Sequence, residues 1–422
     1  MIAAVITGFG AVTPLGNDAR TTWNNLVKGV SGVRPLTAPW ADSIAVRFAG
    51  QTQIDVDAAL ERSVARRLDR ATALALIAYQ EAFHNSGLAD ADFDRDRTAV
   101  CLGTGVGGIQ STLSQWDVMH ERGSRRVSPF TIPMLMGNAP AAQIGLALGA
   151  RGAVRTNVSA CSSSADAIAV ALDTIRLGRA DVVVVGGTEA PLHPLTITAF
   201  TQMQALSTRN AAPASASRPW DVNRDGFVMA EGAVVLVLEA LPHALARGAQ
   251  IYASVAGAGV TADSYSLVQP DPTGRGQAQA MRLAIADAEL TATDISHVNA
   301  HATSTALGDM VEAQAINAVL GATASTVAVT GTKSMTGHLL GAAGALETFA
   351  TAMALYHRIA PPTINLMSPE PALNIDVVTS ARTLPNGSLA ALSNSFGFGG
   401  HNVALLLTNQ HTTYPSTPND AL

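Results

Sequence analysis

The sequence is poor in charged residues, in lysine and in cysteine. Only 14% of its 422 residues are charged, whereas 48% are hydrophobic. An average globular protein has about a quarter of its residues charged, so this composition excludes a disordered chain and predicts extensive burial in a core or a subunit interface. The net charge of −6 provides no general basic surface. We therefore expect neither nucleic acid nor an anionic membrane as a partner.

Cysteine and long apolar runs are also scarce. Cys101 and Cys161 are the only two cysteines, too few for a disulfide framework, which favours the reducing cytoplasm as the location. The most apolar segments, such as 181–186 and 234–238, have the length of a strand, and glycine and proline interrupt the apolar start of the chain. We expect no membrane-spanning segment. The histidines show no metal-binding spacing, so no metal site is predicted.

Short β-branched runs alternate with longer segments of helical periodicity, which predicts an α/β fold with buried strands. The expected strands are 2–7, 98–102, 181–185, 251–255, 327–330 and 390–392. The expected helices are 60–85, 165–177, 276–288, 310–320 and 339–357. Residues 207–217 are expected to form a surface loop.

An internal repeat indicates a duplicated fold. Residues 2–12 and 251–261 share a strand-Gly-x-Gly pattern, at an offset of 249 residues. In addition, a strand-like segment leads into a helix of small residues at Cys161, and a second one does so near His338. These matches predict two related halves, 1–249 and 250–409, followed by a loose tail at 410–422. Each half is expected to bring one helix N-terminus to a shared centre.

Cys161 and two histidines form a candidate catalytic set. Cys161 lies where a strand ends and a helix begins, and helix amides with a nearby imidazole lower a thiol pKa from ~8.5 to roughly 3.5–7.5, so a thiolate is expected. An inert buried thiol fits the local sequence of Cys161 equally well, and it is the expected state of Cys101 within its apolar strand. His301 follows a strand, His338 begins a helix, and Lys333 is one of only two lysines. Together these groups suit thioester chemistry.

Two glycine-rich segments have competing interpretations. Residues 393–402 offer backbone N–H groups to a reacting carbonyl or form a tight turn. Residues 103–108 match the dinucleotide fingerprint after a strand, but no second strand ending in an acid follows about 20 residues on. Nucleotide binding is therefore not predicted.

Four motifs resemble those of the β-ketoacyl-[acyl-carrier-protein] synthases. They are Ser-Ala-Cys-Ser-Ser at 159–163, Asn-Ala-His-Ala-Thr-Ser-Thr at 299–305, Thr-Lys-Ser-Met-Thr-Gly-His at 332–338 and Asn-Ser-Phe-Gly-Phe-Gly-Gly at 394–400. The chain most resembles the elongating type II enzymes, in their actinobacterial form because of His401-Asn402. This similarity implies a thiolase-like fold of two α-β-α-β-α halves in five layers, and a homodimer.

The resemblance also implies residue roles. Cys161 takes the acyl chain, His301 and His338 serve decarboxylation of malonyl-carrier, Lys333 and Glu347 support the histidines, and the amides of Cys161 and Phe398 form an oxyanion hole. Substrate contacts are implied for Thr303, Thr305, Phe396, Val106 and Phe200. Docking of acyl carrier protein, which brings the phosphopantetheine so that no bound cofactor is needed, is implied for Arg66, Arg67, Arg70, Arg125, Arg126 and Arg209.

The expected reaction is the decarboxylative Claisen condensation that elongates fatty acids. Ser164, Ala306 and Ala230 depart from the common family pattern, which leaves open a dedicated ketosynthase of a specialised polyketide-like pathway. A non-catalytic chain-length-factor-like partner is a further alternative, although Cys161 argues against it. Priming synthases, thiolases and chalcone-type synthases differ at the position of His338. The sequence around Cys161 also lacks the local signature of a Cys-His-Asn hydrolase such as a papain-like protease.

Overall fold

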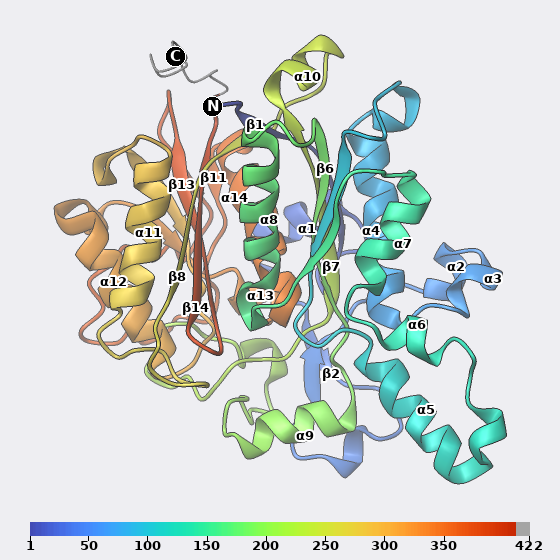
Figure 1. Ribbon diagram of the computed structural model, residues 1–422. Coiled ribbons are helices and arrows are strands. Elements are labelled where there is room, and N and C mark those ends of the chain that lie inside the picture. Colours follow the sequence, from blue (N-terminus) through green and yellow to red (C-terminus); the bar gives the residue numbers. More distant parts are fainter. Residues whose placement is uncertain (411–422) are drawn as a thin grey trace.

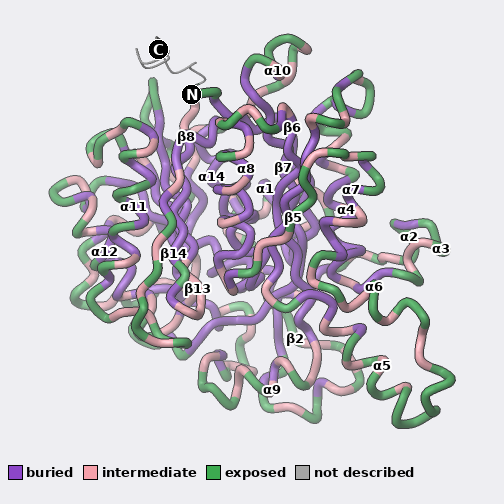
Figure 2. Tube along the Cα trace, in the orientation of Figure 1, coloured by how far each residue is buried: buried purple, intermediate pink, exposed green. Residues whose placement is uncertain are grey.

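A computed structural model describes residues 1–410 and arranges them in five layers (Figure 1). Helices α11 and α12 cover one outer face, and α4 and α7 cover the other (Figure 1). Between them lie two groups of strands that enclose the central helices α8 and α14. The central strands and helices are buried along most of their length, whereas α5 and much of α9 are exposed or half-buried (Figure 2).

Ten strands form the main sheet, in the order β10-β9-β13-β14-β8-β1-β7-β6-β4-β5. They are β1 Ala4–Val12, β4 Thr98–Gly103, β5 Val154–Asn157, β6 Val182–Glu189, β7 Gly232–Ala240, β8 Ala253–Ala262, β9 Ile295–Asn299, β10 Ala328–Thr330, β13 Ala390–Gly397 and β14 His401–Thr408. Two small ribbons pair β2 Val33–Pro35 with β3 Phe48–Gly50, and β11 Ile359–Ala360 with β12 Arg382–Thr383.

The two halves of the sheet repeat one topology. From the centre outwards, β1-β7-β6-β4-β5 and β8-β14-β13-β9-β10 follow the same order in sequence, with two antiparallel pairs and then two parallel pairs. The halves meet where Ala4, Val5 and Ile6 of β1 pair with β8. This duplicated arrangement confirms the expected fold class.

The repeated glycines explain how each half packs. A Cβ atom on Gly10 of β1 would lie 1.9 Å from the carbonyl oxygen of Ala78 in α4. A Cβ atom on Gly259 of β8 would lie 1.9 Å from the carbonyl oxygen of Ala280 in α11. Each central strand therefore needs glycine to let its outer helix approach. This is the structural origin of the strand-Gly-x-Gly repeat.

The α-helices are α1 Ala19–Val27, α2 Val56–Ala59, α3 Arg62–Ala65, α4 Arg70–Asn85, α5 Ile109–Arg122, α6 Thr131–Leu135, α7 Ala139–Leu148, α8 Ser163–Arg176, α9 Pro194–Gln202, α10 Leu241–Ala246, α11 Arg275–Asp287, α12 Gly308–Leu320, α13 Lys333–Thr336 and α14 Ala343–His357. Short 3₁₀ turns precede the two central helices: η4 Ala160–Ser162 before α8 and η8 Leu340–Ala342 before α14.

Most of the expected elements are present, with shifted ends, but the single helix expected at 60–85 is wrong. The chain forms α2 and α3, turns, and begins α4 only at Arg70. Leu60 is extended, and the Asp69 side chain accepts a hydrogen bond from the Ala71 amide, which caps α4 at its true start. The tail expected at 410–422 lies outside the described residues from position 411 onwards.

No helix within residues 1–410 combines the length and hydropathy needed to cross a membrane. The same part of the chain contains no cluster of three or more His, Cys, Asp or Glu side chains arranged to hold a metal ion.

Candidate active site

The candidate site is a largely apolar cavity of about 350 Å³ at the junction of the two halves. Cys161 comes from the first half, whereas His301 and His338 come from the second, and all three line the cavity. The predicted substrate residues line it as well: Val106, Phe200, Thr303, Thr305, Phe396 and Phe398. The sequence thus identified residues from six separate segments that the fold brings together.

The backbone around Cys161 presents its side chain to the cavity. Cys161 lies in η4, directly before α8, and the preceding Ala160 has a left-handed conformation with φ of 52°. In the other half, η8 precedes α14 in the same way, and Leu340 has φ of 47°. The predicted meeting of two helix starts at a shared centre is therefore present, with Cys161 on one side and His338 just before the other.

The expected thiolate at Cys161 is corrected by its surroundings. Burial raises the pKa of the Cys161 thiol to about 11. The positive charge of Lys333 and a hydrogen bond from the Phe398 backbone N–H act in the opposite direction without overcoming burial. At neutral pH the thiol of Cys161 is therefore protonated, and the Phe398 N–H lies beside its sulfur.

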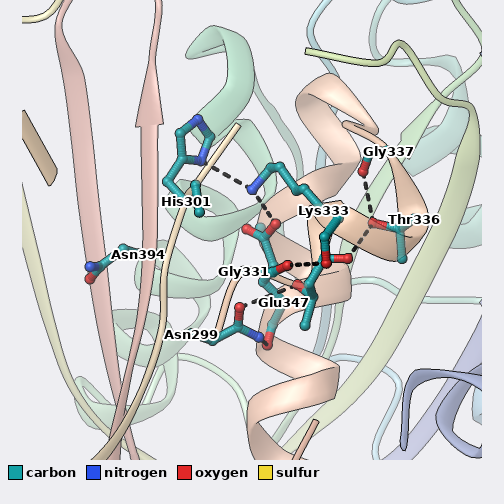
Figure 3. Close-up of polar contacts among 12 residues, drawn as sticks. Asn299, His301, Gly331, Lys333, Thr336, Gly337, Glu347 and Asn394 are labelled. Carbon is teal, nitrogen blue, oxygen red and sulfur yellow. Dashed lines mark hydrogen bonds and ion pairs between the residues drawn. The ribbon is translucent and has the colours of Figure 1, made fainter. Parts of the chain in front are cut away.

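A buried ion pair orients His301 (Figure 3). The Lys333 ammonium pairs with the Glu347 carboxylate of α14, and Lys333 Nζ lies 3.3 Å from Nδ1 of His301. Because an ammonium group only donates, Nδ1 accepts and the imidazole proton lies on Nε2. Burial, followed by the charge of Lys333, holds the pKa of His301 well below its usual value. His301 is therefore a neutral hydrogen-bond donor through Nε2.

His338 is the second neutral imidazole. Its ring lies 5.3 Å from that of His301 at an angle of 88°, and it packs edge-on against Phe227. Burial and the charge of Lys333 hold its pKa well below the usual value. Neither of its ring nitrogens has a hydrogen-bond partner among residues 1–410. A buried imidazole without a partner is ready to bind a polar ligand atom.

Aromatic rings and hydroxyls line the approach to this centre. The Phe200 ring lies 6.4 Å from Phe398 and 5.4 Å from Phe227, and Phe396 lies 5.9 Å from His301. The hydroxyls of Thr303 and Thr305 lie 3.1 Å apart. The cavity therefore has an apolar wall beside the thiol and a pair of hydroxyls on another wall.

Sequence reasoning missed two buried glutamates at the site. Glu312 accepts hydrogen bonds from the backbone N–H groups of His301 and Ala302, which fixes the loop that presents His301. Glu189 accepts four hydrogen bonds near the glycine-rich segment 103–108. Burial raises the pKa of Glu189 to about 7. Neither residue belongs to a short catalytic motif, so the only signal was an acid within an otherwise apolar segment.

Ser164, a departure from the family pattern, has a clear structural partner. Its buried hydroxyl accepts a hydrogen bond from the Ala345 amide in the first turn of α14. Ser164 thus links the starts of the two central helices behind Cys161.

The predicted docking arginines do not share one helix. Arg66 ends α3, Arg67 lies in the following turn, and both are exposed, as are Arg125 and Arg126. The Arg67 guanidinium lies over the Phe130 ring at 5.0 Å, which brings the turn near the segment of Arg125 and Arg126.

Two of the six arginines are engaged internally, which weakens the case for a docking role. Arg70 pairs with the buried Glu231 and also bonds Thr52, because the chain turns before α4 and directs the guanidinium inwards. Arg209 donates to the carbonyl oxygen of Asn223.

A second cavity, of about 490 Å³, lies between α1, α4 and α14. Its lining includes the aromatic residues Trp23, Phe349 and Tyr252. It also includes the positively charged Arg20 and Lys28 and the negatively charged Glu81. It contains no cysteine, and its charges of both signs select no class of ligand.

Comparisons with known proteins agree with this geometry. Residues 3–244 match the model of the beta-ketoacyl synthase N-terminal domain, and residues 252–367 match that of the C-terminal domain. A curated relative from Synechocystis sp., "3-oxoacyl-[acyl-carrier-protein] synthase 2", is 43% identical over 408 residues, covering 95% of this chain and 96% of the relative.

Two solved structures are also similar. A beta-ketoacyl synthase from Burkholderia phymatum superposes with a TM-score of 0.89 at 34% identity, covering 97% of this chain and 100% of that one. A type II polyketide ketosynthase, solved in complex with its acyl-carrier protein and bound to the hexaketide, has a TM-score of 0.89 at 29% identity, with the same coverage.

Proposed function

Because the chain belongs to the β-ketoacyl synthase family, we propose that it condenses an acyl group on Cys161 with malonyl-acyl-carrier-protein in fatty acid elongation. The observation that carries this proposal is the combination of one thiol, one backbone N–H and two neutral imidazoles in a single apolar cavity. Thioester chemistry uses each of these groups.

Acyl transfer begins at the protonated thiol. The sulfur of Cys161 forms a bond to the acyl carbonyl carbon, the bond to the pantetheine sulfur breaks, and the thiol proton passes to that leaving sulfur, with a neutral imidazole as the intermediate acceptor. The backbone N–H groups of Cys161 and Phe398 bind the carbonyl oxygen as it becomes negative. The products are acyl-Cys161 and free carrier thiol.

Decarboxylation and condensation follow at the imidazoles. Nε2–H of His301 and an N–H of His338 donate to the thioester oxygen of malonyl-carrier, which stabilises the enolate left when the C–C bond to the carboxylate breaks and CO₂ departs. The enolate carbon then attacks the carbonyl of acyl-Cys161, and the cysteine sulfur leaves as a thiolate, which takes up one proton from water to restore the thiol. Thr303 and Thr305 are proposed to bind the pantetheine arm because both line the cavity, and no bound cofactor is required.

The type of synthase, its location, the boundary between the halves and the residues that limit acyl length are also proposed. The actinobacterial type rests on His401-Asn402, and a cytoplasmic location is supported by two cysteines that are both free thiols. The division into halves at 249/250 is supported by the repeated strand order. Val106 and Phe200 are proposed to limit acyl length because both line the cavity.

The proposed partners are acyl carrier protein and a second copy of the chain. Arg66, Arg67, Arg125 and Arg126 provide the exposed positive charge for an acidic carrier. The ketosynthase solved with its acyl-carrier protein supports this kind of partner. The proposed homodimer is supported by β5, which within residues 1–410 is an edge strand that pairs only with β4, and by Val158 beside it, which is 65% exposed. A free sheet edge with apolar neighbours is suited to pairing with another chain.

The test separates loading from condensation. Cys161→Ala should show no acyl-enzyme by mass spectrometry, because the nucleophile is gone. His338→Ala should still acquire the acyl group but lose condensation with malonyl-carrier by at least about 10²-fold, as expected for losing one oxyanion donor. Cys101→Ala is the matched control and should behave as the wild type. An acyl-enzyme mass shift that persists in Cys161→Ala would refute the assignment, and catalysis by that variant would favour a different chemistry.

A further inference from the structure

Glu189 is a fully buried carboxylate at the end of β6 that the proposed chemistry does not use. Its Oε2 accepts hydrogen bonds from the backbone N–H groups of Gly105 at 2.6 Å and Gly341 at 2.9 Å. Its Oε1 accepts from Thr104 Oγ1 at 3.0 Å and from the Val106 N–H at 3.2 Å. One side chain thus joins a turn of the first half to η8 of the second half.

The two segments that Glu189 joins are walls of the acyl cavity. Val106 and Leu340 both line it, and Leu340 has the unfavourable φ of 47° for a non-glycine residue. A Cβ atom on Gly105 or Gly341 would lie 2.8 Å or 2.6 Å from Glu189 Oε2. The carboxylate therefore occupies the space between two glycines and sets how closely the segments approach.

We propose that Glu189 is a positioning residue that fixes the Val106 turn against η8 and thereby sets the acyl length that the cavity accepts. This inference rests on the proposed function, since it concerns the acyl cavity of that reaction. A carboxylate offers acceptors to all four donors. Glutamine offers one acceptor oxygen, and its NH₂ group would face the N–H groups of Gly105 and Gly341 or that of Val106, so at least one of the four hydrogen bonds would be lost.

The negative charge of Glu189 gives a second readout. After burial, it is among the groups that raise the pKa of the Cys161 thiol. Removing the charge should shift the pH profile of thiol alkylation by iodoacetamide to lower pH. This measurement requires neither carrier protein nor acyl substrate.

Three variants separate position from charge. The kinetic constants are measured at pH 8, above the pKa of about 7 to which burial raises Glu189, and thiol alkylation is followed over a range of pH. Glu189→Gln removes the charge and at least one of the four hydrogen bonds. Thr104→Val keeps the charge but removes the hydrogen bond to Glu189 and the one that Thr104 accepts from the Gly107 N–H. Glu239→Gln is the control, because Glu239 is equally buried but bonds Thr7, His243 and Arg247 away from the cavity. The readouts are kcat/KM for acyl-carriers of graded length, the alkylation profile and the melting temperature.

We expect Glu189→Gln to reduce the selectivity between acyl chains that differ by two methylenes by about tenfold, and to move the alkylation profile to lower pH. Thr104→Val should reduce selectivity less and leave the alkylation profile unchanged. If Glu189→Gln lowers the melting temperature as Glu239→Gln does while selectivity and alkylation remain those of the wild type, the inference is overturned. If the wild type condenses no substrate, the proposed function fails, and an unchanged alkylation profile in Glu189→Gln then overturns the inference on its own.

Discussion

The ion pairs Lys333–Glu347 and Arg70–Glu231 each contain a buried carboxylate, but their cations differ in solvent exposure. Lys333 and Glu347 are both buried, and burial raises the pKa of Glu347 to about 7. Arg70, in contrast, has a side chain that is 27% exposed, while that of its partner Glu231 is 1% exposed. Removing either cation would leave a buried carboxylate without its main counter-charge.

We predict that Arg70→Ala lowers the free energy of unfolding by about 2–3 kcal/mol, somewhat less than for a fully buried pair because Arg70 is partly exposed. Urea unfolding measures this loss. Arg66→Ala, at an exposed position, should change stability by less than about 0.5 kcal/mol but raise the KM for carrier-bound substrate. If Arg66→Ala lost as much unfolding free energy as Arg70→Ala, the structural role assigned to Arg70 and the docking role assigned to Arg66 would both be contradicted.

The sequence predicted which motif residues line the cavity, but it did not predict the properties that the surroundings determine. Cys161, His301 and His338 could be predicted because each lies at the end of a strand or the start of a helix. Side chains at such positions often face a functional site. The protonation of Cys161 could not be derived in this way, because burial by several distant segments outweighs the local effect of the helix start. Glu189 was missed because its four donors come from residues far away in sequence.

At the scale of elements, β9 lies between β10 and β13 and carries a histidine in its centre. His297 is fully buried, its Nδ1 lies 2.8 Å from the carbonyl oxygen of Ala328, and burial lowers its pKa to about 4. The unfolded chain binds a proton near pH 6.5, whereas the folded chain does so only near pH 4. Stability is therefore fully present above pH 6.5 and falls as the pH is lowered towards 4.

We predict that His297→Gln removes this contribution. The difference in unfolding free energy between wild type and variant should change by up to about 1.4 kcal/mol per pH unit between pH 6.5 and 4, in favour of the variant at low pH. Other histidines titrate equally in both proteins and cancel in the difference. A difference that stays constant with pH would show that His297 has the same pKa in the folded and unfolded states and would refute the prediction.

Elements were predicted well by periodicity and less well at their ends. Strand β6 was found because it begins as a continuous run of valines, as expected for a strand buried on both faces, whereas β9 and β14 were not among the expected strands. The helix expected at 60–85 failed because apolar periodicity runs through the turn, whereas the Asp69 cap fixes the start of α4. The signal was present, since aspartate is a favoured N-cap, but the hydrophobic pattern outweighed it.

At the scale of the whole molecule, the proposed homodimer makes a direct prediction. Val158→Asp should shift the mass measured by light scattering from twice the 43.3 kDa of one chain to the single value, because it places a charge beside the free edge of β5. Leu245→Asp is a matched control, since Leu245 on α10 is 62% exposed, similar to Val158 at 65%. A monomeric wild type would refute the dimer.

The protonated Cys161 has a consequence for chemical endurance. Peroxide and related oxidants attack thiolates far more readily than thiols. An idle molecule, whose sulfur keeps its proton inside an apolar cavity, is therefore a poor target for such damage. The sulfur becomes reactive towards oxidants only while its proton is being transferred during turnover. Oxidation of Cys161 should therefore increase with the number of catalytic cycles rather than with the time that the protein is stored.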